Sequence, residues 1–119
     1  MKFRGMELDF DVFDAETAEA YEEAIQRVQE SRNDAPQGET LSQTIRRQCE
    51  RIFDFFDDLF GDGFHKQVFG ERTNLRECAD AFAEFTTAVS AQKTELDERI
   101  SLYTPNRAAR RAAAVSGRK

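Results

Sequence analysis

The sequence has no long apolar run and no catalytic signature, and these absences set the first limits. No stretch approaches the roughly 18 apolar residues that a membrane-spanning helix needs. The start at Met1 has no basic stretch followed by an apolar one, so we expect neither a signal peptide nor membrane association. The motifs GxSxG, HExxH and the P-loop are also absent. We therefore expect a soluble protein with no enzymatic activity and no cofactor.

Residues that usually hold metals are scarce. The only histidine is His65, and the two cysteines, Cys49 and Cys78, are not part of a CxxC motif. A zinc site would lack its usual ligands, and the two thiols are interpreted as buried and reduced, because each falls in an apolar helical stripe. His65 is interpreted as structural or incidental. Three carboxylates at helical spacing are interpreted as a solvated face that pairs with nearby arginines rather than as a metal site: Asp54, Asp57 and Asp58.

The charge is unevenly distributed along the chain. The 119 residues carry a net charge of −6, but every one of the 23 acidic residues precedes residue 99. Five basic residues and no acid follow residue 103. We predict one domain over 1–103 and a basic tail over 104–119 that is flexible or a frayed helix. In a helical tail, Arg107, Arg110 and Arg111 share one face; contact with a protein is favoured over nucleic acid, since the acidic body repels phosphate.

The N-terminal segment predicts a β-hairpin. Met6, Leu8, Phe10 and Val12 alternate with acidic residues, and this period of two places their side chains on one face of a strand. Residues 4–5 before them read as a tight turn, so the hairpin is predicted over residues 2–12. A two-stranded ribbon is barely stable alone, and its apolar face therefore has to lie on helices.

Three helices follow from apolar periodicity. They are predicted over residues 15–32, 40–60 and 75–103, with one short turn over 65–69. Asp14 and Asn74 are predicted as N-caps. Gln92 and Lys93 interrupt the apolar stripe of the last helix, which is expected to project or fray beyond Val89. The predicted fold is mainly α: a three-helix body with a short N-terminal β-hairpin and a basic C-terminal tail.

Phenylalanine is abundant, with 11 copies and no tryptophan in the chain. The apolar residues of the helix predicted over 40–60 span an arc of roughly 160°, wider than one docking stripe needs. Two interpretations stay open. The face is a Phe-rich core, or part of it, with Phe55 at its edge, is a groove for an apolar partner helix. The candidate partner-binding residues are Phe53, Phe55, Phe56 and Phe60, together with the three tail arginines.

Several segments resemble small proteins of tailed phages and prophages of Gram-positive bacteria. They are KFRGMELDFD at residues 2–11, FDDLFG at 56–61, NLREC at 74–78 and YTPNRAARR at 103–111. The chain is similar to a family of unknown function from siphophage-type tail modules, and to the tail assembly chaperones, which have a short N-terminal hairpin and a helical body.

The resemblance implies a protein that coats the apolar tape measure protein until tail tube subunits displace it. The expected partners are thus the tape measure protein and the tail tube protein, with weak self-association. The expected location is the cytoplasm of the bacterial host, and the protein is not expected in the mature virion. A structural head–tail or tail component, and a protein that contacts nucleic acid or the host, remain as alternatives. The resemblance assigns no functional residue.

Overall fold

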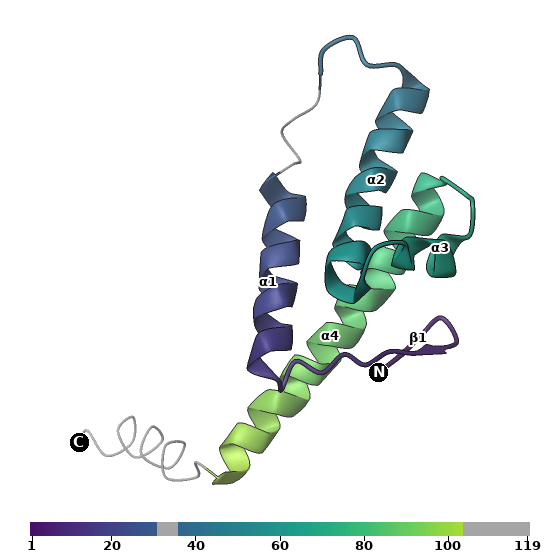
Figure 1. Ribbon diagram of the computed structural model, residues 1–119. Coiled ribbons are helices and arrows are strands. Elements are labelled where there is room, and N and C mark those ends of the chain that lie inside the picture. Colours follow the sequence, from purple (N-terminus) through teal and green to yellow (C-terminus); the bar gives the residue numbers. More distant parts are fainter. Residues whose placement is uncertain (31–35, 104–119) are drawn as a thin grey trace, which may run out of the picture.

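The computed structural model describes residues 1–30 and 36–103 and contains six elements of regular structure (Figure 1). The chain runs through β1 (Lys2–Phe3), β2 (Met6–Glu7), α1 (Ala15–Glu30), α2 (Leu41–Phe60), α3 (Phe64–Phe69) and α4 (Leu75–Tyr103). The mainly helical class with a short antiparallel hairpin is confirmed. The predicted tail over 104–119 lies outside the described residues. Among the residues that are described, no helix has both the length and the apolar character required to span a bilayer.

The N-terminal hairpin is shorter than the alternating pattern predicts. Lys2 pairs with Glu7 and Phe3 with Met6, and the turn between them takes positive φ at Arg4 (50°) and Gly5 (81°). Two central residues with positive φ are typical of the turns that match the twist of a hairpin. The predicted continuation of the second strand to residue 12 is wrong: Leu8 still exchanges two backbone hydrogen bonds with Met1, but no strand among the described residues pairs with residues 9–12.

The alternation nevertheless describes correctly which side chains point inward. Leu8, Phe10 and Val12 are buried, while the acidic residues between them are exposed. The side chain of Gln92 on α4 stands in for a partner strand: its Nε2 donates to the Phe10 carbonyl at 3.1 Å, and its Oε1 accepts from the Val12 amide at 3.0 Å. The segment is therefore an extended strap bound across α4 rather than a strand.

Local sequence signals fix the ends of the longer helices. Thr40 and Gln43 form a capping box before α2, in which each side chain accepts a hydrogen bond from the backbone amide of the other residue. Asn74 accepts from the Glu77 amide at 3.2 Å and caps α4 as predicted. Gly61 stops α2 at a φ of 108° that side-chain-bearing residues rarely adopt.

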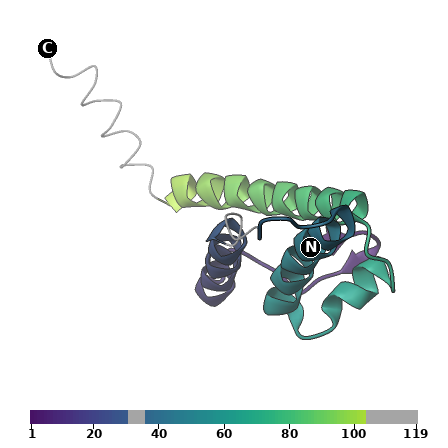
Figure 2. The same cartoon turned by 90° about the horizontal axis from the view of Figure 1, so that it is seen from above.

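The helices form two layers. Figure 2 shows α4 along one side of the molecule and α1, α2 and α3 along the other. Phe85 of α4 lies at the centre of the interface between these layers and is fully buried. Its ring lies within about 6 Å of rings from the hairpin, the strap, α1 and α2: Phe3, Phe10, Tyr21, Phe55, Phe56 and Phe60. One aromatic cluster therefore joins every part of the body.

Candidate partner-binding surfaces

The apolar arc of α2 is mostly core. Phe56 is fully buried and Phe55 is 1% exposed. The expectation that Phe55 lies at an exposed edge is wrong: its ring packs edge-on against Phe82 at 4.9 Å and Phe85 at 5.7 Å. The arc is wide because α2 contacts α1 on one side, α4 on another and α3 at its end. The Phe55 ring is therefore covered by Tyr21 of α1 and by Phe82 and Phe85 of α4.

Phe53 and Phe60 are half-buried and contact neighbouring rings. Phe53 stacks on the imidazole of His65 with ring centroids 4.4 Å apart, and Phe60 lies 4.5 Å from Phe64. Both contacts involve α3, the short helix that folds back on the end of α2. The predicted turn over 65–69 is thus confirmed as a helix that begins one residue earlier, and it covers this part of the predicted binding face.

Asp57 holds the corner between α2 and α3. Its carboxylate accepts a hydrogen bond from the His65 amide at 2.9 Å and pairs with His65 Nδ1 at 2.9 Å. Partial burial works to raise the pKa of Asp57, but the hydrogen bonds from His65 and Gly63 outweigh it and bring that pKa below its usual value. The prediction that Asp57 lies on a solvated face and pairs with a nearby arginine is wrong, because its carboxylate pairs with the imidazole of His65. His65 has a structural role here.

The two cysteines confirm the sequence prediction. Cys49 of α2 and Cys78 of α4 are both free and fully buried. Burial and a hydrogen bond with Cys49 raise the pKa of Cys78 to about 12, so its thiol stays protonated and unreactive at neutral pH. Within residues 1–30 and 36–103, no three histidine, cysteine, aspartate or glutamate side chains come together as a metal site.

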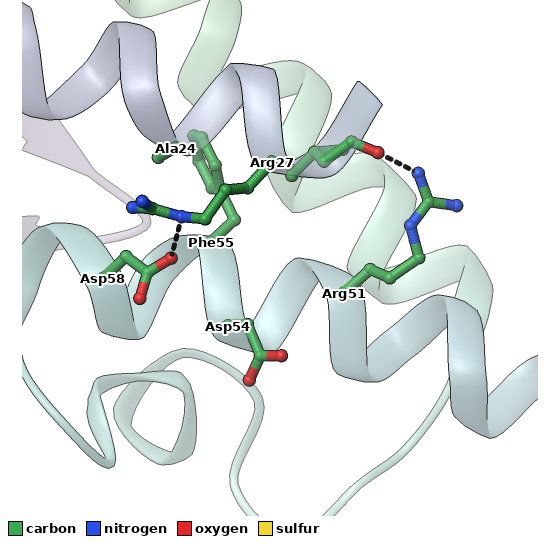
Figure 3. A pocket seen from close by; sticks show the side chains of 7 residues that line it. Ala24, Arg27, Arg51, Asp54, Phe55 and Asp58 are labelled. Carbon is green, nitrogen blue, oxygen red and sulfur yellow. Dashed lines mark hydrogen bonds and ion pairs between the residues drawn. The ribbon is translucent and has the colours of Figure 1, made fainter. Parts of the chain in front are cut away.

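A groove of about 530 Å³ lies along the contact between α1 and α2 (Figure 3). Phe55 reaches it from below, and charged side chains from both helices line it. Arg27 donates to Asp58 at 3.1 Å, and Arg51 donates to the carbonyl of Val28 near the end of α1. Partial burial, and then the nearby carboxylates of Asp58, Asp57 and Glu50, raise the pKa of Asp54. The groove is therefore apolar at its floor, and its charged lining is balanced, with Arg27 and Arg51 beside Asp54 and Asp58.

Exposed apolar side chains gather at the end of α4. Val89 is the last fully buried residue of this helix, which continues to Tyr103 and extends past α2 and α3 (Figure 1). Leu102 is 79% exposed and Tyr103 is 73% exposed. Arg99 lies 5.6 Å above the ring of Phe13, which is itself partly exposed. We call the side of α4 that carries Leu96, Ile100 and Tyr103, together with the neighbouring Phe13, the distal face; Leu102 lies on another side of the helix. The helix projects as predicted and does not fray within the described residues.

A second apolar surface lies at the opposite end of the body. Leu41, 78% exposed, begins α2 beside Leu75, which begins α4, and a shallow depression of about 640 Å³ runs between them. Neither Leu41 nor the distal face is among the predicted partner-binding residues. Apolar periodicity could have indicated both, because each continues a helical stripe past the last buried residue. The predicted tail residues Arg107, Arg110 and Arg111 lie outside the described residues.

Comparison with protein-family models identifies the family of the chain. A family model described as a family of unknown function (DUF6673) matches residues 4–114. No curated protein and no solved structure matches the chain.

Proposed function

The chain belongs to the family of unknown function DUF6673, and from this premise we propose that it is a non-enzymatic tail assembly chaperone. In this role it holds the apolar tape measure protein soluble in the host cytoplasm until tail tube subunits replace it, and it stays out of the finished virion. The identity of the client rests on the sequence resemblance described above. The structure contributes a surface suited to such a client.

The distal face is the observation that carries this proposal. Tyr103 exposes most of its side chain on a helix that extends past the body, where the described residues of the chain do not cover it. Clustered exposed apolar residues on a small protein mark contact sites for other molecules. Leu96, Ile100 and Tyr103 follow the i, i+4, i+7 spacing with which one helix receives another.

Acidic side chains surround this apolar surface and suit a holding function. The body over residues 1–103 has 12 basic and 23 acidic residues. Net charge of one sign keeps a complex from associating with its copies. A client helix covered by the distal face thus acquires the solubility of the acidic body.

Co-expression with a siphophage tape measure protein tests the proposal. The wild-type chain is expected to keep the tape measure protein in the soluble fraction. Tyr103→Asp is expected to lower the soluble amount severalfold without unfolding the chaperone, because the side chain is exposed. Leu41→Asp is the matched control, since it places the same charge on a similarly exposed apolar side chain at the opposite end of the molecule.

Two results contradict the proposal. One is a tape measure protein that is equally insoluble with and without the wild-type chain. The other is detection of the chain as a stoichiometric component of purified virions, which favours the structural tail component instead.

A further inference from the structure

The distal face lies beside the most acidic part of the chain. No lysine or arginine occurs between Arg4 and Arg27, and the eight acidic residues of that stretch are all exposed. The stretch includes the strap, which crosses α4 at Gln92, and the start of α1, which is preceded by the contact of Phe13 with Arg99. The apolar side chains at the end of α4 are therefore exposed next to a strongly negative surface.

Two adjoining depressions run between the strap and α4, with volumes of about 480 Å³ and about 260 Å³; Asp11 and Gln92 line both. The carboxylates that line them are those of Glu7, Asp9, Asp11 and Glu95. The cations that line them are already paired, because Arg99 contacts Glu95 at 3.1 Å and the N-terminal ammonium group contacts Glu7 at 3.3 Å. Asp9 and Asp11 have no cationic partner among the described residues.

The chain itself continues from the distal face with the opposite charge. Helix α4 ends at Tyr103, two positions before Pro105, and helices usually end at or before the residue that precedes a proline. Residues 104–119, which lie outside the described residues, contain five basic side chains and no acid. This segment thus starts at the exposed apolar surface and complements the charge beside it.

The length of the segment suits the exposed part of α4. Gln92 precedes Tyr103 by eleven positions, which correspond to about 16 Å along a helix axis. After a reversal at Pro105, the thirteen residues 107–119 span about 20 Å as a helix. They therefore suffice to cover the distal face from its end back to the strap.

The sequence of the segment also matches the apolar surface. Ala108, Ala112 and Val115 repeat the i, i+4, i+7 spacing with which α4 presents its apolar side chains on the distal face. Arg107 and Arg111 each precede one of these alanines, so that in a helix they flank the apolar stripe. Because the segment is joined to α4, its effective concentration at the distal face is on the order of millimolar. Weak contacts are therefore enough to keep it bound.

We propose that residues 104–119 fold back over the distal face of their own chain and cover it until a client helix takes their place. The basic side chains then lie beside the acids of the strap and of α4. This inference rests on the proposed function in one respect, because the tail regulates the surface offered to the client. The contact between the tail and α4 needs no client and is measured without one.

Paramagnetic broadening of amide signals in the full-length chain tests the contact. A nitroxide is attached at Ser116→Cys; the native thiols of Cys49 and Cys78 are fully buried and are not expected to react. Amides of residues 92–100 and of Phe13 are expected to lose most of their intensity, whereas amides of residues 41–45, at the opposite end of the molecule, keep theirs.

Charge variants of the tail separate docking from mere proximity. Arg107→Glu, Arg110→Glu and Arg111→Glu, combined in one chain, should restore most of the lost intensity, because the acidic surface repels the new carboxylates. The three matching Arg→Lys changes should not restore it. A mixture of nitroxide-bearing chains with isotope-labelled chains that lack the nitroxide should show no broadening, since each tail covers its own chain.

A helical peptide tests whether the tail controls access to the distal face. The probe is a fluorescent peptide of about five helical turns, with leucines at i, i+4, i+7 spacing and glutamines between them. It has no charged side chain, so the charges of the tail act on it only by covering or exposing the face. Fluorescence anisotropy is expected to show severalfold tighter binding to the triple-glutamate variant than to the wild-type chain, because a cover lowers the fraction of competent protein. The triple-lysine variant should bind like the wild type.

Three results overturn the inference: equal broadening in the wild-type and triple-glutamate chains, broadening that arises in the mixed sample and so comes from a second copy, and equal binding of the peptide to both chains. The proposed function fails separately. If glutamate substitution releases the tail and exposes the face to the peptide, but the tape measure protein stays insoluble beside the wild-type chain, the cover is supported and the tail assembly role is contradicted.

Discussion

Helices α1 and α2 lie side by side and both have one apolar face, yet they are fixed to the molecule in different ways. On α2 the buried residues are Cys49, Phe55 and Phe56, and its ends are set by a capping box and a glycine. On α1 the one fully buried residue is Ala24. Burial of large side chains stabilises far more than an amphipathic pattern alone. We therefore expect α1 to separate from the rest of the fold more easily than α2, although both helices have the same amphipathic period.

The same contrast divides α4. Its first half carries Cys78, Ala81, Phe85 and Val89, all buried, whereas its last three turns carry apolar residues that stay partly or largely exposed. The apolar side chains of α4 thus pack into the core in its first half, whereas those near its end are available to a partner. Mutations at matched positions measure how sharp these two contrasts are.

The largest effect is expected for Phe55→Ala. Removing a fully buried ring that contacts α1 and α4 leaves a cavity, and the free energy of unfolding should fall by about 3–5 kcal/mol. Urea unfolding followed by circular dichroism measures it. Leu102→Ala, at an exposed position of α4, should change this free energy by no more than about 0.5 kcal/mol. A small effect of Phe55→Ala would mean that its ring is not part of the core.

A smaller effect is expected for Tyr21→Ala on α1. The ring is only half-buried, so its loss should cost about 1–2.5 kcal/mol in the same assay. If Tyr21→Ala destabilised the protein as much as Phe55→Ala, α1 would be as firmly fixed as α2, contrary to the comparison above.

The strap of residues 8–12 depends on one side chain of α4. Gln92→Leu removes two hydrogen bonds to the backbone of the strap and should lower the free energy of unfolding by about 1–2 kcal/mol. Exchange of the Val12 amide with solvent should accelerate as well. Lys93→Leu, at the neighbouring exposed position, serves as the control and should leave that amide protected.

Asp57 and Asp54, one turn apart on α2, should contribute with opposite sign to the change of folding stability with pH. The pKa of Asp57 is lower in the folded chain than in the unfolded one, so Asp57 stabilises the fold above its unfolded pKa of about 4, and this stabilisation is lost as pH falls through the folded value. Asp57→Asn should therefore lower the melting temperature at pH 7 and flatten the loss of stability in acid.

The reverse holds for Asp54, whose pKa is raised in the folded chain. Its charged form opposes folding at neutral pH, and stability is gained as pH falls through the raised pKa. Asp54→Asn should slightly raise the melting temperature at pH 7. Shifts of the same sign in both variants would contradict the hydrogen bonds assigned to Asp57.

Much of the fold could be predicted from local patterns. The N-cap at Asn74 and the apolar periods were predicted, and each depends on residues close together in the chain. The capping box of Thr40 and Gln43 is a local signal of the same kind. The period of two over residues 6–12 predicted which side chains point inward even though no strand forms there. The predicted strand failed because hydrogen bonds from a distant residue, Gln92, replaced those of a neighbouring strand.

The candidate site was less predictable. The width of the apolar arc on α2 indicated several neighbours, but not that α1 and α4 would together cover Phe55. That outcome depends on long-range packing, which a periodic pattern does not encode. The sequence pattern showed Gln92 only as a polar interruption of the apolar stripe of α4. Its role as a hydrogen-bonding partner could not be predicted, because the residues it bonds to lie about 80 positions earlier in the chain.

Hydrogen exchange of the unmodified protein tests most directly whether α1 opens apart from the rest of the body. Amides in the middle of α1 are expected to exchange through a local opening and to be clearly less protected than those around Cys49–Phe56 of α2 and Cys78–Val89 of α4, which exchange only when the whole domain unfolds. Equal protection in all three segments, with the same dependence on denaturant, would contradict it.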